Sequence, residues 1–155
     1  MLDVENLSLS NPMQLWDQAG LDSLDVRKTT ISSWMLMGIY QTKEKLTNMK
    51  LSKTAQCPGC STQNETLEHM IFHCSFYQKI RETYLPKFLN MNCKLVPVLQ
   101  SKFLTLLSIL DPGSSKLPSE VRDNWTCLKS AYANSRNFCY DIHMKRTKLL
   151  EKQQT

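Results

Sequence analysis

The sequence has few glycines, and their placement excludes one class of binding site. Loops that cradle phosphate groups need several glycines close together. Here the 155 residues include only four, and they stand singly: Gly20, Gly38, Gly59 and Gly113. Walker A and dinucleotide-binding motifs are therefore absent.

Long apolar runs are also lacking. No run approaches the roughly 18 residues that a transmembrane helix needs, so we expect no membrane partner. Residues 1–5 lack the basic start and apolar stretch of a signal peptide. We therefore expect an intracellular protein, nuclear or cytoplasmic, whose six cysteines are thiols or metal ligands rather than disulfides.

Strand patterns are nearly absent, because few runs alternate Val, Ile or Thr with polar residues. Apolar residues recur instead at helical spacing, which predicts a mostly α fold. In the second predicted helix the apolar face comprises Val26, Ile31, Trp34, Met35 and Met37, and Gly38 ends it. The predicted helices cover residues 13–16, 23–37, 42–49, 66–84 with a break near Cys74, 98–110, and 119 onward, with a charged tail at 145–154 that frays.

One compact cluster of metal-ligating residue types stands out. Cys57, Cys60, His69 and Cys74 form the pattern Cys-x2-Cys-x8-His-x4-Cys. Zinc prefers four tetrahedral ligands, with metal–sulfur distances of about 2.3 Å. A tight turn at Pro58-Gly59 lets the first two thiolates converge, and the following helical segment supplies the other pair. The pattern predicts a CCHC zinc knuckle, with Gly59 permitting the bent backbone.

His73 leaves an alternative open for the fourth ligand. On a continuous helix His69 and His73 lie one turn apart on the same face, so His73 could replace Cys74. Thiolate is the commoner structural ligand, and a chain break at Cys74-Ser75 would turn Cys74 toward the metal.

A catalytic role for the metal is not expected. Four protein ligands close the coordination sphere, whereas a catalytic zinc keeps one position open for water. Glu65 and Glu68 precede His69, the wrong order for a deaminase-like His-x-Glu motif. We expect no catalytic residue and no small-molecule substrate.

The residues around the cluster resemble a known family. The matched stretches run in order from Asp25-Val26-Arg27-Lys28 through Trp34 to Tyr40, then Cys57-Pro58-Gly59-Cys60, Glu65-Thr66-Leu67-Glu68-His69, Cys74 and Ile80-Arg81. This series is similar to the C-terminal zinc-binding region of non-LTR (LINE-type) retrotransposon reverse transcriptases.

The resemblance implies a module that follows the polymerase in a longer element-encoded protein. It implies zinc as the cofactor, Cys57, Cys60, His69 and Cys74 as its ligands, and template RNA or target DNA as the partner. The polymerase motif Tyr/Phe-x-Asp-Asp does not occur in this sequence. We therefore expect a fragment or remnant of a reverse transcriptase polyprotein with no enzymatic activity of its own.

The distribution of basic residues indicates where a nucleic acid would bind. The formal net charge is +5, and basic residues are in excess near the cluster. Lysines neutralise phosphates, and exposed aromatic rings stack on unpaired bases. The aromatic residues of this region are either such stacking groups or core: Tyr40, Phe72, Phe76, Tyr77 and Tyr84. The predicted nucleic-acid-binding residues are Lys43, Lys45, Lys50, Lys53, Lys79 and Arg81.

An alternative is a structural or protein-interaction helical domain in which zinc only stabilises the fold. The last helix would then pack on another protein, such as a reverse transcriptase core, or would simply line the internal core. The residues in question are Trp125, Tyr132, Phe138 and Tyr140.

We expect three regions along the chain. Residues 1–22 form an N-terminal extension with a short helix. Residues 23–92 form a helical zinc-binding region with its knuckle at 57–74, and residues 93–155 form a C-terminal helical region.

Overall fold

The computed structural model describes residues 13–91, 102–117, 119 and 128–154. These residues form helices and loops, and their only β-pairing is an isolated antiparallel bridge between Gln56 and Asn64. The mostly α fold is thus confirmed. The helices are α1 (Met13–Asp17), α2 (Ser23–Leu36), α3 (Lys43–Asn48), the π-helical turn η2 (His69–His73), the 3-10 turn η3 (Ser75–Tyr77), α4 (Gln78–Met91), α5 (Lys102–Leu110) and α7 (Leu128–Gln154).

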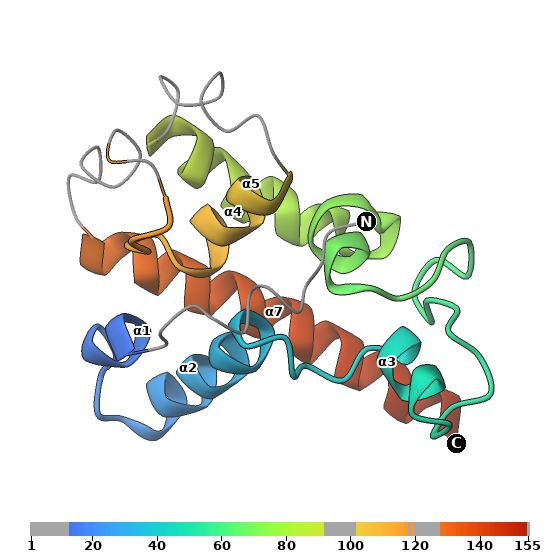
Figure 1. The fold of residues 1–155 in the computed structure, drawn as a ribbon. Helices are drawn as coiled ribbons and strands as arrows, with labels where there is room; N and C mark the ends of the chain where they lie inside the picture. Colours follow the sequence, from blue (N-terminus) through green and yellow to red (C-terminus); the bar gives the residue numbers. More distant parts are fainter. Residues whose placement is uncertain (1–12, 92–101, 118, 120–127, 155) are drawn as a thin grey trace.

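The long helix α7 organises the molecule. It crosses the whole structure, with α2 along one side and α4 and α5 along the other (Figure 1). The core holds apolar side chains of α2, of the segment 67–77 and of α5 against Phe138, Cys139 and Ile142 of α7. Helix α7 therefore packs against α2, α4 and α5.

The boundaries of α2 follow local chemistry. The Asp22 carboxylate caps its start by accepting hydrogen bonds from the Leu24 and Asp25 N–H groups, both at 3.0 Å. Gly38 follows its end with φ 67°, as predicted.

The face of α2 that meets α7 differs from the predicted apolar face. Small residues line much of it, since Thr29, Ser32 and Ser33 are buried beside Ile31 and Met35. Small side chains let two helices approach closely, and the Ser33 hydroxyl is satisfied within α2 by the Thr29 carbonyl at 2.8 Å. The bulkier Val26 and Trp34 are displaced toward solvent as a result.

Two expectations about the later helices are wrong. Helix α4 continues through Pro86 to Met91 instead of ending at residue 84, at the cost of one backbone donor. The charged tail is helical to Gln154 because it is docked: the Lys145 ammonium donates to the Phe76 carbonyl and lies 4.4 Å from the Phe76 ring centroid.

The protein-interaction surface predicted on the last helix is largely internal. Tyr132 and Phe138 are fully buried, and Tyr140 packs against the core. Trp125 lies outside the described residues, as do Cys93 and Cys127. None of the described helices is long and apolar enough to span a bilayer.

Candidate metal centre

The first two cysteines lie on a tight loop that the backbone closes on itself. The Cys57 N–H donates to the Gln63 carbonyl at 2.8 Å, and the Ser61 N–H donates to the Cys57 carbonyl at 2.9 Å. Ser61 has φ 57°, which reverses the chain direction after Cys60. This loop brings the thiols of Cys57 and Cys60 to the same side.

Glycine is needed in this loop for a reason that the sequence did not show. Gly59 is not among the residues with positive φ, so a bent backbone does not require it. A Cβ atom there would lie 2.8 Å from the Cβ of Phe76, which is closer than side chains tolerate. Gly59 is therefore required by the packing of Phe76.

The other two groups come from a distorted helical turn. The Thr66 hydroxyl accepts a hydrogen bond from the His69 N–H at 3.0 Å, and the Cys74 N–H donates to the His69 carbonyl at 2.7 Å. The second bond spans five residues, which defines a π turn. Cys74 then leaves the helix with extended backbone (φ −65°, ψ 121°), as the predicted break requires.

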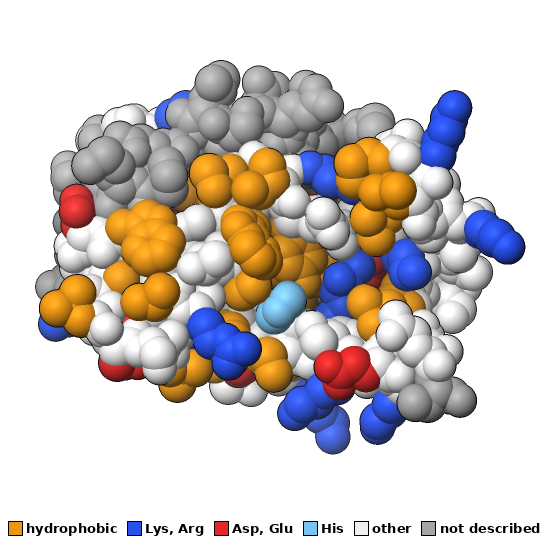
Figure 2. Space-filling model, turned by 90° about the horizontal axis from the view of Figure 1, so that it is seen from below, with side chains coloured by type: hydrophobic (Ala, Val, Ile, Leu, Met, Phe, Trp, Pro, Cys, Tyr) orange, Lys and Arg blue, Asp and Glu red, His pale blue; other side chains and the backbone are white. Residues whose placement is uncertain are grey.

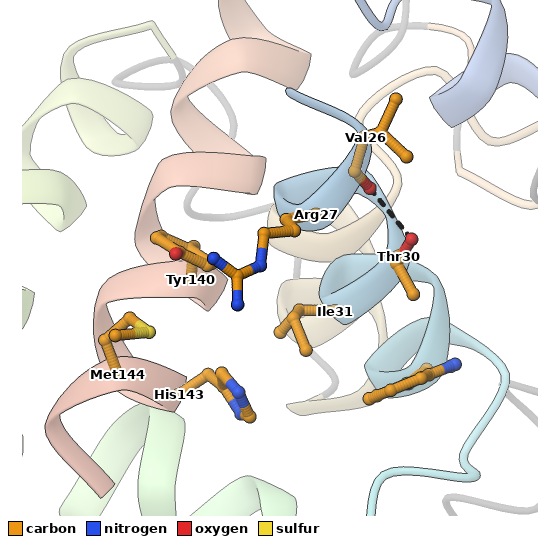
Figure 3. A pocket seen from close by; sticks show the side chains of 8 residues that line it. Val26, Arg27, Thr30, Ile31, Tyr140, His143 and Met144 are labelled. Carbon is orange, nitrogen blue, oxygen red and sulfur yellow. Dashed lines mark hydrogen bonds between the residues drawn. The ribbon is translucent and has the colours of Figure 1, made fainter. Parts of the chain in front are cut away.

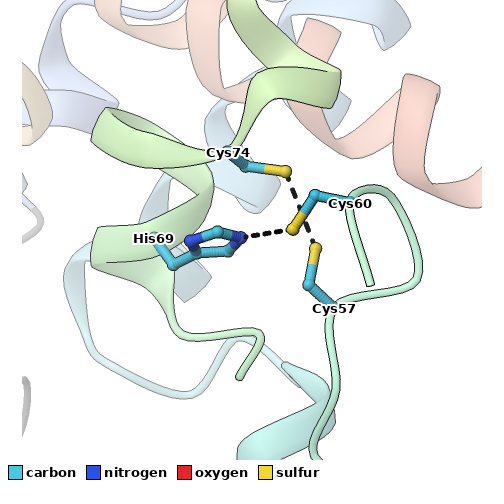
Figure 4. A group of neighbouring side chains, drawn as sticks. All are labelled: Cys57, Cys60, His69 and Cys74. Atoms are coloured by element: carbon cyan, nitrogen blue, oxygen red, sulfur yellow. Dashed lines mark hydrogen bonds between the residues drawn. The ribbon is translucent and has the colours of Figure 1, made fainter. Parts of the chain in front are cut away.

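The four side chains converge (Figure 4). Their potential ligand atoms all lie within 4.8 Å of one another. The Cys57 and Cys74 sulfurs are 3.7 Å apart, and the Cys60 sulfur is 3.3 Å from His69 Nε2. A tetrahedral zinc ion with bonds of about 2.3 Å separates two sulfur ligands by about 3.8 Å. The donor set and its spacing therefore fit a structural zinc ion.

Burial and hydrogen bonding give the thiols different acidities. Burial raises the pKa of Cys57 to about 12 and also raises that of Cys74. At Cys60 burial opposes ionisation, but hydrogen bonds from Thr62, Gln63 and His69 outweigh it and lower the pKa to about 6. Cys60 is thus the most acidic of the three thiols, and the two buried thiols would have to release protons when a metal binds.

His73 lies away from this cluster. Its side chain is 49% exposed, and its Nε2 atom is 3.7 Å from the Glu68 carboxylate. The structure thus brings Cys74, and not His73, to the other three groups.

Arg81 occupies a position that the sequence did not predict. Its guanidinium donates to the Cys74 carbonyl and, at 3.3 Å, to the Met70 carbonyl. Burial lowers its pKa, although Cys74 and Glu82 oppose that shift. Arg81 thereby holds the backbone within the π turn and directly after it.

The other five predicted nucleic-acid-binding residues lie on α3, on the loop after it and at the start of α4. Lys43 and Lys45 are half-buried on α3, and the loop that follows exposes Lys50 and Lys53. Lys79 is exposed in the first turn of α4. The aromatic residues of this region belong to the core or its edge, because Tyr40 and Tyr77 are buried and Phe72, Phe76 and Tyr84 pack against the core.

A buried ion pair joins the knuckle to α7. Glu65 is fully buried, and Arg146 donates to its two oxygens from Nε at 2.7 Å and from Nη2 at 2.8 Å. Nη2 also donates to the Gln41 carbonyl at 3.0 Å, and the Lys43 N–H donates to Glu65 at 2.7 Å. The pair spans 81 residues of sequence. Sequence reasoning missed it, although a cation on the same helical face as Phe138 and Ile142 could have indicated a buried partner.

The comparisons with known proteins agree with this geometry. Residues 13–80 match the family model described as zinc-binding in reverse transcriptase. The match covers less than half of the chain, and it confirms the resemblance of this segment to a zinc-binding region of reverse transcriptases. Comparison with curated proteins and with solved structures gives no match.

Proposed function

We propose that the chain is a zinc-stabilised module in which Cys57, Cys60, His69 and Cys74 hold one structural zinc ion. The observation that carries this proposal is the convergence of these four groups inside the family-matched segment. Four protein ligands leave no position for a reacting water, so the metal would stabilise the fold and take no part in catalysis. The module would have no polymerase activity of its own.

We further propose that this module binds RNA or DNA. The support is the family match together with exposed and half-exposed cations on α3, on the loop after it and at the start of α4: Lys43, Lys45, Lys50, Lys53 and Lys79. Arg81 stays in the predicted set, although its guanidinium already donates hydrogen bonds to the Met70 and Cys74 carbonyls. A reverse transcriptase core is the protein partner that the family description suggests.

The test measures zinc content and nucleic-acid affinity on the same preparation. We expect one zinc per chain, and an affinity for labelled RNA and DNA oligonucleotides that falls with salt. With about four phosphates contacted, the log–log slope is about −3 to −4. The double variant Lys50→Ala/Lys53→Ala should lower the magnitude of the slope by about 1.4 to 1.8.

The matched control is Lys148→Ala, which removes an exposed lysine of α7 outside the predicted set. It should leave the slope within error of the parent chain. Absent or salt-independent binding of both RNA and DNA would refute the nucleic-acid part of the proposal, and a native protein without zinc would refute the metal part.

A further inference from the structure

A shallow groove lies between α2 and α7, on the side of the molecule seen in Figure 2. It consists of two adjoining hollows of about 270 and 450 Å³, and both are lined by Trp34 and His143. Figure 2 shows hydrophobic side chains spread across the middle of this face, with a histidine among them. The larger hollow falls within the roughly 300–1,000 Å³ range of small-molecule sites, so the groove has room for a nucleobase.

Trp34 gives the groove its most distinctive group. Its neighbours Ser33 and Met35 are buried, whereas Trp34 itself is 41% exposed. Val26 and Thr30 precede it at helical spacing on the same face of α2 and line the first hollow with it. A partly exposed indole ring of this kind offers a flat surface to a planar ligand.

The charged groups of the groove are of one sign. Arg27 and Arg146 are the charged residues that line the two hollows, and no described carboxylate does so. Glu65 neutralises Arg146, so Arg27 supplies the positive charge. Its guanidinium reaches from α2 across the groove toward Tyr140 of α7 (Figure 3).

Polar groups extend the groove toward α3. Gln41 and His143 line the larger hollow, and the His143 ring is tied to the Tyr40 hydroxyl at 3.0 Å. Burial, together with the nearby Arg146 and Arg27, lowers the pKa of His143, so its imidazole is neutral at pH 7. Gln41 stands two residues before α3, which carries the half-buried Lys43 and Lys45.

We propose that this groove receives unpaired bases of a single-stranded nucleic acid, with one base stacked on Trp34 and the adjoining phosphate at Arg27. An aromatic surface beside a cation is the combination that binds single strands with little sequence preference. A strand seated there would continue over Gln41 to the lysines of α3. The inference rests on the proposed nucleic-acid binding and assigns it to unpaired rather than duplex nucleic acid.

The experiment compares Trp34→Ala with Trp16→Ala in the full chain. Both tryptophans are 41% exposed, but Trp16 lies on α1 and lines neither hollow. The probes are a fluorescent 15-nucleotide oligo-U and a duplex of equal length, followed by anisotropy over a range of salt concentrations. Zinc content and circular dichroism show whether each variant keeps the fold.

Trp34→Ala should weaken oligo-U binding roughly 5- to 150-fold, the loss expected for one stacked base. Its salt slope should stay unchanged, because stacking releases no counterions, and its duplex affinity should stay near that of the parent. Trp34→Phe should restore most of the loss, and Trp16→Ala should have no effect. Arg27→Gln should lower the magnitude of the slope by about 0.7 for the single strand.

Several results would overturn the inference. These are an unchanged oligo-U affinity of a folded Trp34→Ala chain, an equal loss in Trp16→Ala, or an equal loss on the duplex. If one of these results is found and the parent chain still binds nucleic acid in a salt-dependent way, the proposed function stands. The groove would then be assigned to a protein segment instead of a nucleic-acid strand. If the parent chain binds no nucleic acid at all, the proposed function itself fails.

Discussion

The ion pair between Glu65 and Arg146 leads to a quantitative prediction about how the knuckle is held. The variant Arg146→Met keeps a long apolar side chain but removes the guanidinium. It leaves the fully buried Glu65 carboxylate with the Lys43 N–H as its one remaining recorded donor, and it deprives the Gln41 carbonyl of a hydrogen bond. Breaking a buried pair on one side costs about 3–5 kcal/mol, so we expect a loss of that size in the free energy of unfolding.

A double-mutant cycle separates the pair from general damage to the core. Glu65→Gln alone leaves Arg146 charged and buried, so it should also destabilise the fold. In the double variant Glu65→Gln/Arg146→Met neither charge remains. Its loss should therefore be smaller than the sum of the single losses, with a coupling energy of roughly 1–3 kcal/mol.

The assay is urea unfolding followed by circular dichroism, together with zinc affinity measured by competition with a chelator. Glu65 lies between Cys60 and His69 in the sequence, so undocking α7 should also loosen the metal site. Part of the lost free energy of unfolding should come from the folded metal-binding segment 57–74. For every 1.4 kcal/mol lost there, the zinc affinity should fall tenfold. Lys148→Met, at an exposed position of the same helix, is the matched control.

The reasoning would be refuted if Arg146→Met lay within about 0.5 kcal/mol of Lys148→Met. Additive losses in the cycle would equally refute it, because they would mean that the two side chains do not depend on each other. If Arg146→Met left the zinc affinity unchanged, the ion pair would stabilise the docking of α7 but not the metal site.

Three further predictions concern the knuckle. Chelation of zinc, or the variant Cys60→Ser, should speed hydrogen exchange in residues 50–85 and in the C-terminal half of α7, because that half is docked on them. The N-terminal half of α7 should stay protected. Uniform protection of all these residues would contradict the prediction. Gly59→Ala should destabilise the fold by about 1–3 kcal/mol in urea unfolding, because its Cβ meets Phe76, and a neutral result would disprove the packing argument. Arg81→Met should weaken zinc binding in chelator competition by leaving the Cys74 and Met70 carbonyls without their donor, and an effect confined to nucleic-acid affinity would instead assign Arg81 to that partner.

The parts of the structure that were predicted correctly depend on local chemistry. Thr42 caps α3 by accepting a hydrogen bond from the Lys45 N–H, and Gly38 ends α2, as their residue types indicate. The break at Cys74 follows from a ligand pattern contained in a short stretch of chain. Each of these features needs only neighbours within a few residues.

The parts that were missed depend on groups far apart in the sequence. The side chain of Phe76 leaves no room for a Cβ atom at position 59, so glycine is required there. The buried carboxylate of Glu65 is explained only by its ion pair with Arg146 on the last helix. Trp34 was assigned to the core, and it is displaced because α7 meets the small residues beside it. Helical spacing shows which residues share a face, but it does not show which face another helix will cover.

These long-range contacts also bear on the size of the functional unit. The family match ends at residue 80, whereas α7 begins at Leu128. Yet α7 supplies Arg146 to Glu65, carries Lys145 to the Phe76 carbonyl and forms one wall of the groove beside Trp34. Without α7, the matched segment would keep its four candidate ligands but would expose a carboxylate and a core face that are now buried. The candidate metal site and the groove therefore form one unit only when α7 holds them together.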